Sequence, residues 1–494
     1  MVTRWLPTTA ALTLVACAAL AQSRSVRIDA SKATGTIRSL QGVNLGPLHT
    51  QPALPDLTSQ YRDLCIDLVR AHDFFGPTDI DSQAKDRGAN LVIFPDWNAD
   101  PAKEESYRFG PSDRMIKAIM DCGAKAYFRL GRSFAADPTP PPDFDKFAEV
   151  AKHIAMHYNA GWAGGYRYGI QYWEVWNEPN VQKDWVPNKG LYLFWSGTRE
   201  QYFELYERTA RALKAFDPQL KVGGPSLAEG ARESPWREGF VQFCVQRKVP
   251  LDFLSWHHYH GDSSDPYDMV RIGRDVRRLL DKNGFRHAES HVNEWNITLN
   301  KGKTGPQHQA SMESAAFTAC ALMCLQDAPV NLSCYYTGNA GNMGSFEPDG
   351  SYRKKAYAFK ATGAMLATPV RLKVIGANTQ GFAVLAGRSP DQKTVQVLIS
   401  NYRIQQPQEP PRQSAPPGSH GLERRKVRPA NFQGYSLKVS SLPWGDKPYV
   451  VKRYRIDEQQ DFALVQEMAT KGATLEVRQP LAAPAIELIV LTRE

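Results

Sequence analysis

Short apolar runs alternate with longer amphipathic stretches between residues 40 and 336. The runs are rich in aromatic and β-branched residues and end in polar or glycine-containing turns, which predicts buried strands, while the amphipathic stretches predict helices. The predicted strands are 40–46, 71–75, 125–130, 172–176, 220–225, 251–259, 291–296 and 332–336. The predicted helices are 57–65, 115–122, 144–158, 200–216, 265–282 and 309–325. This alternation is typical of a (β/α)8 TIM barrel.

The pattern changes after residue 366. Strand-like runs follow one another without a long helix, which predicts a β-sandwich. These runs are 370–374, 381–386, 394–402, 434–439, 449–456 and 485–491, and a Pro-, Gln- and Ser-rich loop occupies 405–428. We therefore expect an α/β fold with four parts. They are a signal peptide at 1–21, an N-terminal segment at 22–38 that joins the sandwich, a (β/α)8 barrel at 39–366 and an accessory C-terminal β-sandwich at 367–494.

The first 21 residues have the features of an export signal. Arg4 supplies the positive charge, 6–20 is mostly apolar, and Ala19-Leu20-Ala21 fits a small-x-small cleavage site. The apolar stretch is too short and too often interrupted by threonine for a membrane span. A second interpretation is a bacterial lipobox at 14–17, in which Cys17 would carry a lipid anchor. We expect an exported protein, periplasmic or secreted in the first case and a lipoprotein in the second.

Composition and charge narrow the range of partners. The 494 residues are 42% hydrophobic and 22% charged, which is typical of a soluble globular protein. The net charge of +9 weakly favours acidic partners. The Lys and Arg residues are dispersed except at 423–428, and the chain has no nucleic-acid-binding motif. We therefore expect no nucleic-acid partner and interpret 423–428 as a solvated loop.

The cysteines do not predict a scaffold or a metal site. Once Cys17 is removed, six remain, which is too few for disulfides to be the scaffold of a chain this long, although one disulfide stays open. Cys320 and Cys324 are four apart in a helical pattern, which predicts neighbours on one buried face. No His or second Cys pair follows at zinc spacing, so no metal and no cofactor are predicted.

The stretch 171–180 carries the chemistry around which the barrel is organised. Its strand ends at Trp176, Glu178 follows, and Pro179 cannot continue the ladder because it has no N–H. Catalytic groups lie at this end of the strands in parallel barrels. Burial between Trp173 and Trp176 would raise the pKa of the Glu178 carboxyl, which suits a general acid. The alternative is a strand-end glutamate that caps a neighbouring helix.

A second carboxylate, Glu294, lies at the end of the strand 291–296. Glycoside hydrolysis needs such a pair, because one group protonates the leaving oxygen and the other attacks the anomeric carbon or activates a water that does. Counting 172–176 as the fourth strand puts Glu294 on the seventh, across the barrel mouth from Glu178. A separation of about 5–5.5 Å would indicate retention of configuration, and a wider gap inversion.

Six stretches form, in order along the barrel, a pattern far more specific than any one motif. They are 176–180 (WNEPN), 194–198 (FWSGT), 202–206 (YFELY), 221–225 (KVGGP), 252–259 (DFLSWHHY) and 293–296 (NEWN). The set resembles glycoside hydrolase family 39, in the clan A barrel superfamily that also holds β-xylosidases and α-L-iduronidase. The sandwich resembles the family more weakly, at 401–402 and 454–457.

The resemblance implies a retaining reaction by double displacement, with Glu178 as acid/base and Glu294 as nucleophile. It also implies that Asn177 holds the 2-hydroxyl of the sugar and that Tyr259 hydrogen-bonds the nucleophile. Arg70 is expected to orient the acidic pair, with a helix-end or surface ion pair as the alternative.

The same resemblance implies that His257 binds near the catalytic carboxylates and that His72 contacts sugar hydroxyls. The alternative for these histidines is a structural role or a metal site. His257, His258 and His260 cluster in the sequence, but neighbours on a strand point to opposite faces, which argues against shared ligation. Trp295 is a candidate for stacking on a sugar. Trp97 is a second candidate, with a structural loop role as the alternative.

One departure concerns the segment after the eighth strand. The family's xylosidases carry an aromatic residue and acidic groups there, which contact the sugar. Tyr336 matches the aromatic residue, but 336–344 has no acidic residue, and Glu347 is the only candidate replacement.

The resemblance implies a β-xylosidase-like exo-glycosidase that acts on fragments of plant or bacterial oligo- or polysaccharides. The departure leaves another pentoside, a hexoside or an exopolysaccharide open as substrate, with exo or endo action. A non-catalytic carbohydrate-binding protein is a rival of another class, but it would tolerate the loss of either glutamate, and both are present. A metal-dependent hydrolase is a further rival, testable by chelation.

Overall fold

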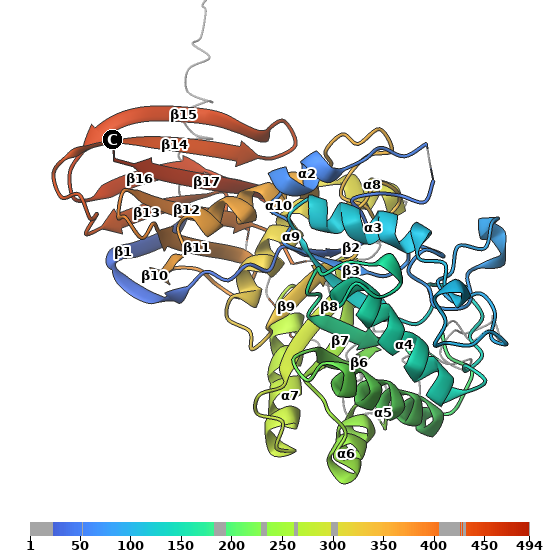
Figure 1. Ribbon diagram of the computed structural model, residues 1–494. Coiled ribbons are helices and arrows are strands. Elements are labelled where there is room, and N and C mark those ends of the chain that lie inside the picture. Colours follow the sequence, from blue (N-terminus) through green and yellow to red (C-terminus); the bar gives the residue numbers. More distant parts are fainter. Residues whose placement is uncertain are drawn as a thin grey trace, which may run out of the picture.

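The computed structural model describes residues 23–51, 53–181, 194–228, 235–260, 265–297, 305–404, 425, 427 and 431–493. A barrel and a β-sheet domain lie side by side, with the barrel at the lower right of Figure 1. The predicted signal peptide, Cys17 and all of the predicted loop 405–428 except Arg425 and Val427 lie outside the described residues.

Eight parallel strands close into a barrel, because β2 pairs with β3 on one side and with β9 on the other. They are β2 (Gly42–Asn44), β3 (Leu68–Ala71), β4 (Lys125–Leu130), β5 (Tyr172–Val175), β6 (Lys221–Leu227), β7 (Phe253–His260), β8 (Glu289–Ile297) and β9 (Leu332–Tyr335). Alternate side chains of these strands point into the barrel, so its interior is a packed core. The predicted (β/α)8 barrel is confirmed.

Helices cover the outside of the barrel between the strands (Figure 1). They are α2 (Thr58–Asp63), α3 (Gly110–Asp121), α4 (Phe144–Asn159), α5 (Arg199–Phe216), α6 (Arg237–Arg247), α7 (Asp268–Lys282), α8 (Gly305–Ala310), α9 (Met312–Leu325) and α10 (Lys354–Ala364). The α5 helix begins with a capping box, in which the Thr198 and Gln201 side chains each accept from the other residue's amide. Two helices, α6 and α10, are absent from the predicted set, because their apolar residues do not form one stripe.

The second domain is a nine-stranded sheet in the order β15-β14-β17-β12-β11-β10-β1-β13-β16. Its strands are β1 (Ser23–Thr36), β10 (Val370–Ile375), β11 (Phe382–Arg388), β12 (Thr394–Asn401), β13 (Gly434–Ser440), β14 (Pro448–Ile456), β15 (Asp461–Lys471), β16 (Leu475–Pro480) and β17 (Ala485–Thr492). Residues from both halves of the sheet, such as Leu437 and Ile489, share one buried cluster, so the sheet folds over into two layers. The predicted C-terminal β-sandwich is confirmed.

The helix α9 joins the two domains. It is buried along its whole length, between the barrel strands and the sheet. Phe317 on this helix packs edge-on against Tyr402, with ring centroids 5.6 Å apart, and Ser400 Oγ donates to the Ala316 carbonyl at 2.8 Å. Leu398 of β12 belongs to the same apolar cluster as the barrel. The sheet is therefore packed onto the barrel wall at α9 (Figure 1).

The second barrel strand corrects a prediction. The structure ends β3 at Ala71, whereas the sequence pattern predicts a strand at 71–75. Asp73 and Phe75 have φ values of 59° and 58°, in the left-handed region that an extended strand does not contain. His72 and Asp73 therefore lie in the loop after the strand, at the barrel mouth.

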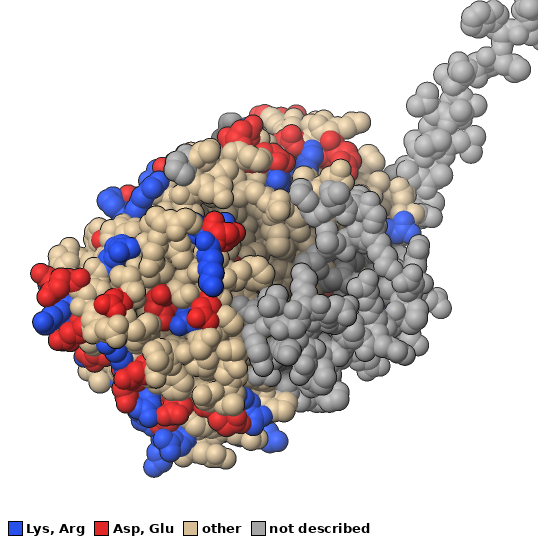
Figure 2. All heavy atoms as spheres, turned by 90° about the vertical axis from the view of Figure 1, so that its right-hand side faces the viewer, with Lys and Arg blue, Asp and Glu red and all other residues tan. Residues whose placement is uncertain are grey.

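Three further findings concern the surface charge, the helices as membrane spans and the cysteines. Figure 2 shows basic and acidic side chains interspersed over the described part of one face, so the positive charge is not gathered into one patch there. Within the described residues, no helix is both long enough and apolar enough to cross a membrane. All six described cysteines are free thiols, and Cys320 and Cys324 are neighbours in α9 with Sγ atoms 3.9 Å apart.

Candidate active site

A sharp turn after β5 brings Asn177 and Glu178 to the barrel mouth. Trp176 and Glu178 have φ values of 72° and 43°, which side-chain-bearing residues rarely adopt. The Glu178 amide donates to the Ser226 carbonyl at 3.0 Å, which holds the turn against the loop end of β6. Strain of this kind persists only where surrounding contacts stabilise it, and it is frequent in active sites.

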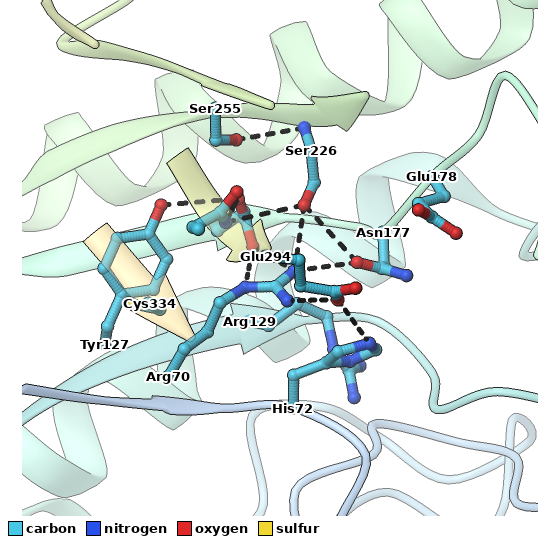
Figure 3. Close-up of polar contacts among 12 residues, drawn as sticks. Arg70, His72, Tyr127, Arg129, Asn177, Glu178, Ser226, Ser255, Glu294 and Cys334 are labelled. Atoms are coloured by element: carbon cyan, nitrogen blue, oxygen red, sulfur yellow. Dashed lines mark hydrogen bonds and ion pairs between the residues drawn. The ribbon is translucent and has the colours of Figure 1, made fainter. Parts of the chain in front are cut away.

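Glu294, on β8, lies among hydrogen-bond donors. Its Oε1 accepts from Arg70 Nη1 at 2.8 Å and lies 3.3 Å from His72 Nε2. Its Oε2 accepts from the Tyr259 hydroxyl at 2.7 Å and lies 3.4 Å from His257 Nδ1. Figure 3 shows this carboxylate beside Arg70 and His72, with Glu178 further along the mouth. Donors on both oxygens stabilise the carboxylate form.

Glu178 lies close to Glu294. One oxygen of each carboxylate and one ring nitrogen of His257 all lie within 4.8 Å of one another. Glu178 Oε1 is 2.7 Å from His257 Nδ1, and His257 Nε2 is 2.6 Å from Ser226 Oγ. The side chain of Glu178 is 13% exposed against 5% for Glu294, so Glu178 is the more accessible of the two.

Arg70, from β3, is fully buried at the centre of the polar contacts (Figure 3). Its Nη2 donates to Asn177 Oδ1 at 2.8 Å and to Ser226 Oγ at 2.9 Å. Its Nε donates to Glu174 Oε2 at 2.7 Å, and Nη1 bonds Glu294. The predicted contact of Arg70 with the acidic pair is thus found at Glu294, through a buried ion pair rather than a surface one.

Burial sets the protonation of the neighbouring groups. It raises the pKa of the Glu294 carboxyl above its usual 4.5, while the charges of His257 and Arg70 oppose the shift. Burial, together with the positive charges of Arg70 and Arg129, holds the pKa of His72 well below its usual 6.5. Arg129 Nε donates to His72 Nδ1 at 3.1 Å, so a neutral His72 carries its proton on Nε2, the nitrogen that faces Glu294. Burial also raises the pKa of Tyr259 well above 10, which keeps it a donor.

The histidines of β7 lie on opposite sides of the strand. His257 contacts both glutamates, whereas His258 and His260 pack against each other with ring centroids 4.3 Å apart. His260 also contacts Phe317 on α9, outside the barrel.

Trp295 corrects a prediction, because it does not face the mouth. Its side chain is fully buried, donates to Ser333 Oγ at 2.7 Å and packs edge-on against Tyr335. Its neighbour Glu294 points inward, so Trp295 points outward, toward α9. A ring without exposed surface does not stack on a substrate. Trp97 donates to Asp81 Oδ2 at 2.8 Å in the loop after β3, and its stacking role stays a prediction.

The loop after β3 supplies an acidic group beside Tyr336. The Tyr336 hydroxyl donates to Asp73 Oδ2 at 2.6 Å, and Asp73 Oδ1 accepts from the Phe134 amide at 2.8 Å. The Tyr336 ring lies 6.1 Å from that of Tyr259, next to Glu294. Glu347, the candidate replacement for the missing acids, is instead paired with Arg353 at 2.9 Å and is 42% exposed.

Sequence reasoning missed a layer of polar residues beneath the glutamates. Glu174 on β5 accepts from Asn293 Nδ2 at 2.6 Å and from the Tyr127 hydroxyl at 3.3 Å. Ser226 also belongs to this layer, as do the buried pair Arg129 and Asp79, 2.7 Å apart. For Glu174 the available signal is a lone charged residue in an apolar strand, four positions before Glu178.

The three atoms of Glu178, His257 and Glu294 have a spacing that a metal ion could bridge. The Arg70 guanidinium and the Tyr259 hydroxyl already occupy the two oxygens of Glu294. An ion there would lie beside the fixed positive charge of Arg70, which already pairs with Glu294. The donor set therefore fits two working carboxylates better than a metal site.

Comparisons with known proteins agree with this geometry. The sequence profile described as glycosyl hydrolases family 39 matches residues 89–338. A β-xylosidase from Geobacillus stearothermophilus is 28% identical over 259 residues, which cover 46% of this chain and 48% of that protein. The chain thus spans about half the length of the curated relatives it matches.

Solved structures match nearly the whole chain. A glucosidase from Croceicoccus marinus has a TM-score of 0.83 and 33% identity, covering 96% of this chain and 99% of the other. A monomeric β-xylosidase from Caulobacter crescentus CB15 has a TM-score of 0.68 and 20% identity, covering 95% and 99%. The second likeness concerns the fold alone.

Proposed function

The chain belongs to glycosyl hydrolases family 39, and from this premise we propose that it is a retaining glycosidase with Glu178 as acid/base and Glu294 as nucleophile. The distance between the carboxylates carries the proposal. An oxygen of each lies within 4.8 Å of the other. Retaining enzymes hold their two carboxyl groups about 5–5.5 Å apart, whereas inverting enzymes leave about 6.5–9.5 Å for a water.

In the first step the Glu294 carboxylate attacks the anomeric carbon. The bond from that carbon to the leaving oxygen breaks, and the proton of Glu178 passes to this oxygen. In the second step Glu178 takes a proton from water, whose oxygen attacks the same carbon and releases Glu294. Two inversions give net retention.

The surroundings of the two glutamates support this division of roles. Arg70, His72 and Tyr259 each present a hydrogen-bond donor to Glu294, which suits a carboxylate nucleophile. Glu178 is more exposed and reaches His257, which suits a group that exchanges protons with a leaving group and water.

Three groups are proposed to bind the sugar. Asn177 Nδ2 is buried and has no hydrogen-bond partner in the described structure, because Arg70 bonds only the amide oxygen. An unpaired buried donor costs about 1–3 kcal/mol, which a sugar 2-hydroxyl would offset as it accepts this bond. His72 would bind the sugar beside Asn177, and the ring of Tyr336 would pack against it.

Two glycones are proposed for the site. A β-xyloside follows from the names of the curated relatives, and exo action follows with it. A glucoside is the second candidate, because the glucosidase from Croceicoccus marinus is more similar and matches nearly the whole chain. The two sugars differ by one hydroxymethyl group at C5.

Hydrolysis of aryl xylosides and glucosides, in both anomeric forms, tests the proposal when the protein is run beside Glu178→Ala and Glu294→Ala. We expect release from one glycoside, its loss in Glu294→Ala and its recovery with azide in Glu178→Ala. Azide replaces water as nucleophile and needs no base, so the product is a glycosyl azide of retained configuration. Activity that survives Glu294→Ala would overturn the assignment. A protein that binds the oligosaccharide but cleaves none would be a carbohydrate-binding protein.

We also propose that the protein is exported. The charged, apolar and small-residue segments at 1–21 support this. Mass spectrometry of the mature N-terminus distinguishes the two processing routes, because cleavage after Ala21 leaves Gln22 first and lipidation leaves a modified Cys17.

A further inference from the structure

Glu174 is a third buried carboxylate, four residues before Glu178 and on the inner face of β5. It has no exposed surface. Arg70 bridges it to the nucleophile, because Nε donates to Glu174 Oε2 at 2.7 Å and Nη1 donates to Glu294 Oε1 at 2.8 Å. One guanidinium thus shares its single positive charge between two buried carboxylates.

From this geometry we infer that Glu174 is a positioning residue, which fixes the Arg70 guanidinium and limits how far its charge stabilises the Glu294 carboxylate. The inference rests on the proposed function of Glu294 as nucleophile. Without Glu174, the whole charge of Arg70 would act on Glu294, which would then be a weaker base and a weaker nucleophile.

Neighbouring strands hold Glu174 in place. Its Oε1 accepts from Asn293 Nδ2 of β8 at 2.6 Å and from the Tyr127 hydroxyl of β4 at 3.3 Å. The Tyr127 hydroxyl is 3.3 Å from His291 Nδ1 and His291 Nε2 is 2.9 Å from Glu289, so the contacts continue to the other end of the barrel. Burial holds the pKa of Tyr127 well above 10 and that of His291 below 6.5, so both stay neutral near pH 7. Arg70 is therefore the cation in contact with Glu174.

Titratable groups from several elements face Glu294. Besides Arg70, they are the neutral His72 from the β3 loop, Tyr259 and His257 from β7, Glu178 from the β5 loop, and Asp73 at longer range. Arg70 bonds both Glu174 and Glu294. A change in the charge of Glu174 therefore reaches Glu294 through Arg70 and through space.

The test is the pH dependence of kcat/KM for Glu174→Gln, which removes the charge and keeps the shape. We expect the acid limb to move down by about one pH unit, because a neighbouring charge shifts a pKa by about 1–3 units. We expect kcat to fall about tenfold with KM changed less than about threefold, as for an interaction that matters in the transition state. Glu174→Asp keeps the charge and should leave the acid limb in place while kcat falls.

Glu487→Gln is the matched control. Glu487 is also fully buried and paired with arginines, Arg453 and Arg455, but it lies on β17 in the sheet. It should lose stability without moving the acid limb. Tyr127→Phe serves if Glu174→Gln does not fold, because it removes one hydrogen bond to Glu174 but keeps its charge. The charge of Glu174 then acts more fully on Arg70, so the acid limb should move by a smaller amount and in the opposite direction, to higher pH.

An infrared titration separates this inference from the proposed function. The carboxyl band that disappears in Glu294→Gln reports the protonation of Glu294 without any turnover. If the acid limb and this band stay in place in Glu174→Gln and Tyr127→Phe, the inference is wrong even though wild type is active. If the band moves but no glycoside is cleaved by wild type, the inference stands and the proposed function fails.

Discussion

At the scale of single residues, the two oxygens of Glu294 have different partners. Arg70 and His72 contact Oε1. The Tyr259 hydroxyl donates to Oε2, and His257 Nδ1 lies 3.4 Å from the same oxygen. An oxygen that attacks carbon must give up a hydrogen bond or share it. The Tyr259 hydroxyl has a single proton that can turn about the C–O bond to follow such a change, whereas the Arg70 fork is fixed.

Tyr259→Phe should therefore lower kcat/KM by about 100-fold, at the lower end of the loss that follows removal of a single oxyanion-hole donor. The removed donor stabilises the carboxylate form, so the acid limb should also move to higher pH. Steady-state kinetics against pH measure both. Tyr336→Phe is the control, because it removes a hydroxyl 2.6 Å from Asp73 rather than one on Glu294. An effect of equal size in both variants would contradict a specific role for Tyr259.

The wild-type pH profile follows from the burial of Glu294. Burial raises its pKa above 4.5, so the carboxylate is protonated, and the nucleophile lost, at a pH higher than for an exposed glutamate. We expect the acid limb of kcat/KM to have a midpoint above pH 4.5, measured in the absence of product. A midpoint below 4.5 would mean that the donors on Glu294 outweigh its burial.

At the scale of elements, the periodicity of the sequence predicts the barrel well. The predicted 125–130 agrees with β4 at both ends, because a run of buried residues follows the exposed Lys125 and is closed by Gly131. The position of β3 is not predicted, because the left-handed turn at Asp73 leaves no hydrophobic signature. The strand β15 is missed because its residues are exposed on both faces.

Some residues of the candidate site can likewise be predicted from the sequence, and others cannot. Glu178 and Glu294 can be predicted, since each follows an apolar strand in a motif of several residues. The contacts of Glu174, Asn293 and Tyr127 cannot, because each is one polar residue in a separate strand, and only the closed barrel brings them within hydrogen-bond distance. Trp295 shows the opposite error, since its place in a motif says nothing about which face of β8 it occupies.

The amino end of β8 contributes stability that depends on pH. Glu289 is partly buried, which raises its pKa, but His291 and Lys221 lower it to about 2 from 4.5. A carboxyl with a lowered pKa stabilises the fold above the pKa of the unfolded chain, and this stabilisation is lost as the pH falls from about 4.5 toward 2. The full shift would be worth about 3 kcal/mol, and solvent screening of this partly exposed group reduces it to about 1–2 kcal/mol.

Glu289→Gln should accordingly lose about 1–2 kcal/mol at pH 7 and progressively less below pH 4.5. Urea unfolding at several pH values measures the difference from wild type. Glu476→Gln, at an exposed glutamate paired with Lys438 on the sheet, is the control and should change little at any pH. A difference for Glu289→Gln that stays constant with pH would point to lost packing rather than lost charge.

At the scale of the whole molecule, the sheet and the barrel share a core. Leu398 and Val397 are consecutive on β12 and both fully buried, but they point to opposite sides. Leu398 belongs to the cluster that includes the barrel and α9, whereas Val397 belongs to the cluster inside the sheet. The helix α9 belongs to the barrel and is also covered by the sheet. Unfolding of either domain therefore exposes apolar surface of the other.

We therefore expect the two domains to unfold in one transition, unlike proteins whose domains meet at a small polar interface. Leu398→Ala should cost about 2–5 kcal/mol, as for other buried leucines. Val397→Ala should cost less, since fewer methyl groups are lost. In both variants the midpoint of residual activity and the midpoint of far-ultraviolet circular dichroism should fall together on heating. If Val397→Ala lost the circular dichroism signal of its sheet at a lower temperature than its activity, the domains would be independent. The helix α9 would then be stable without the sheet that covers it.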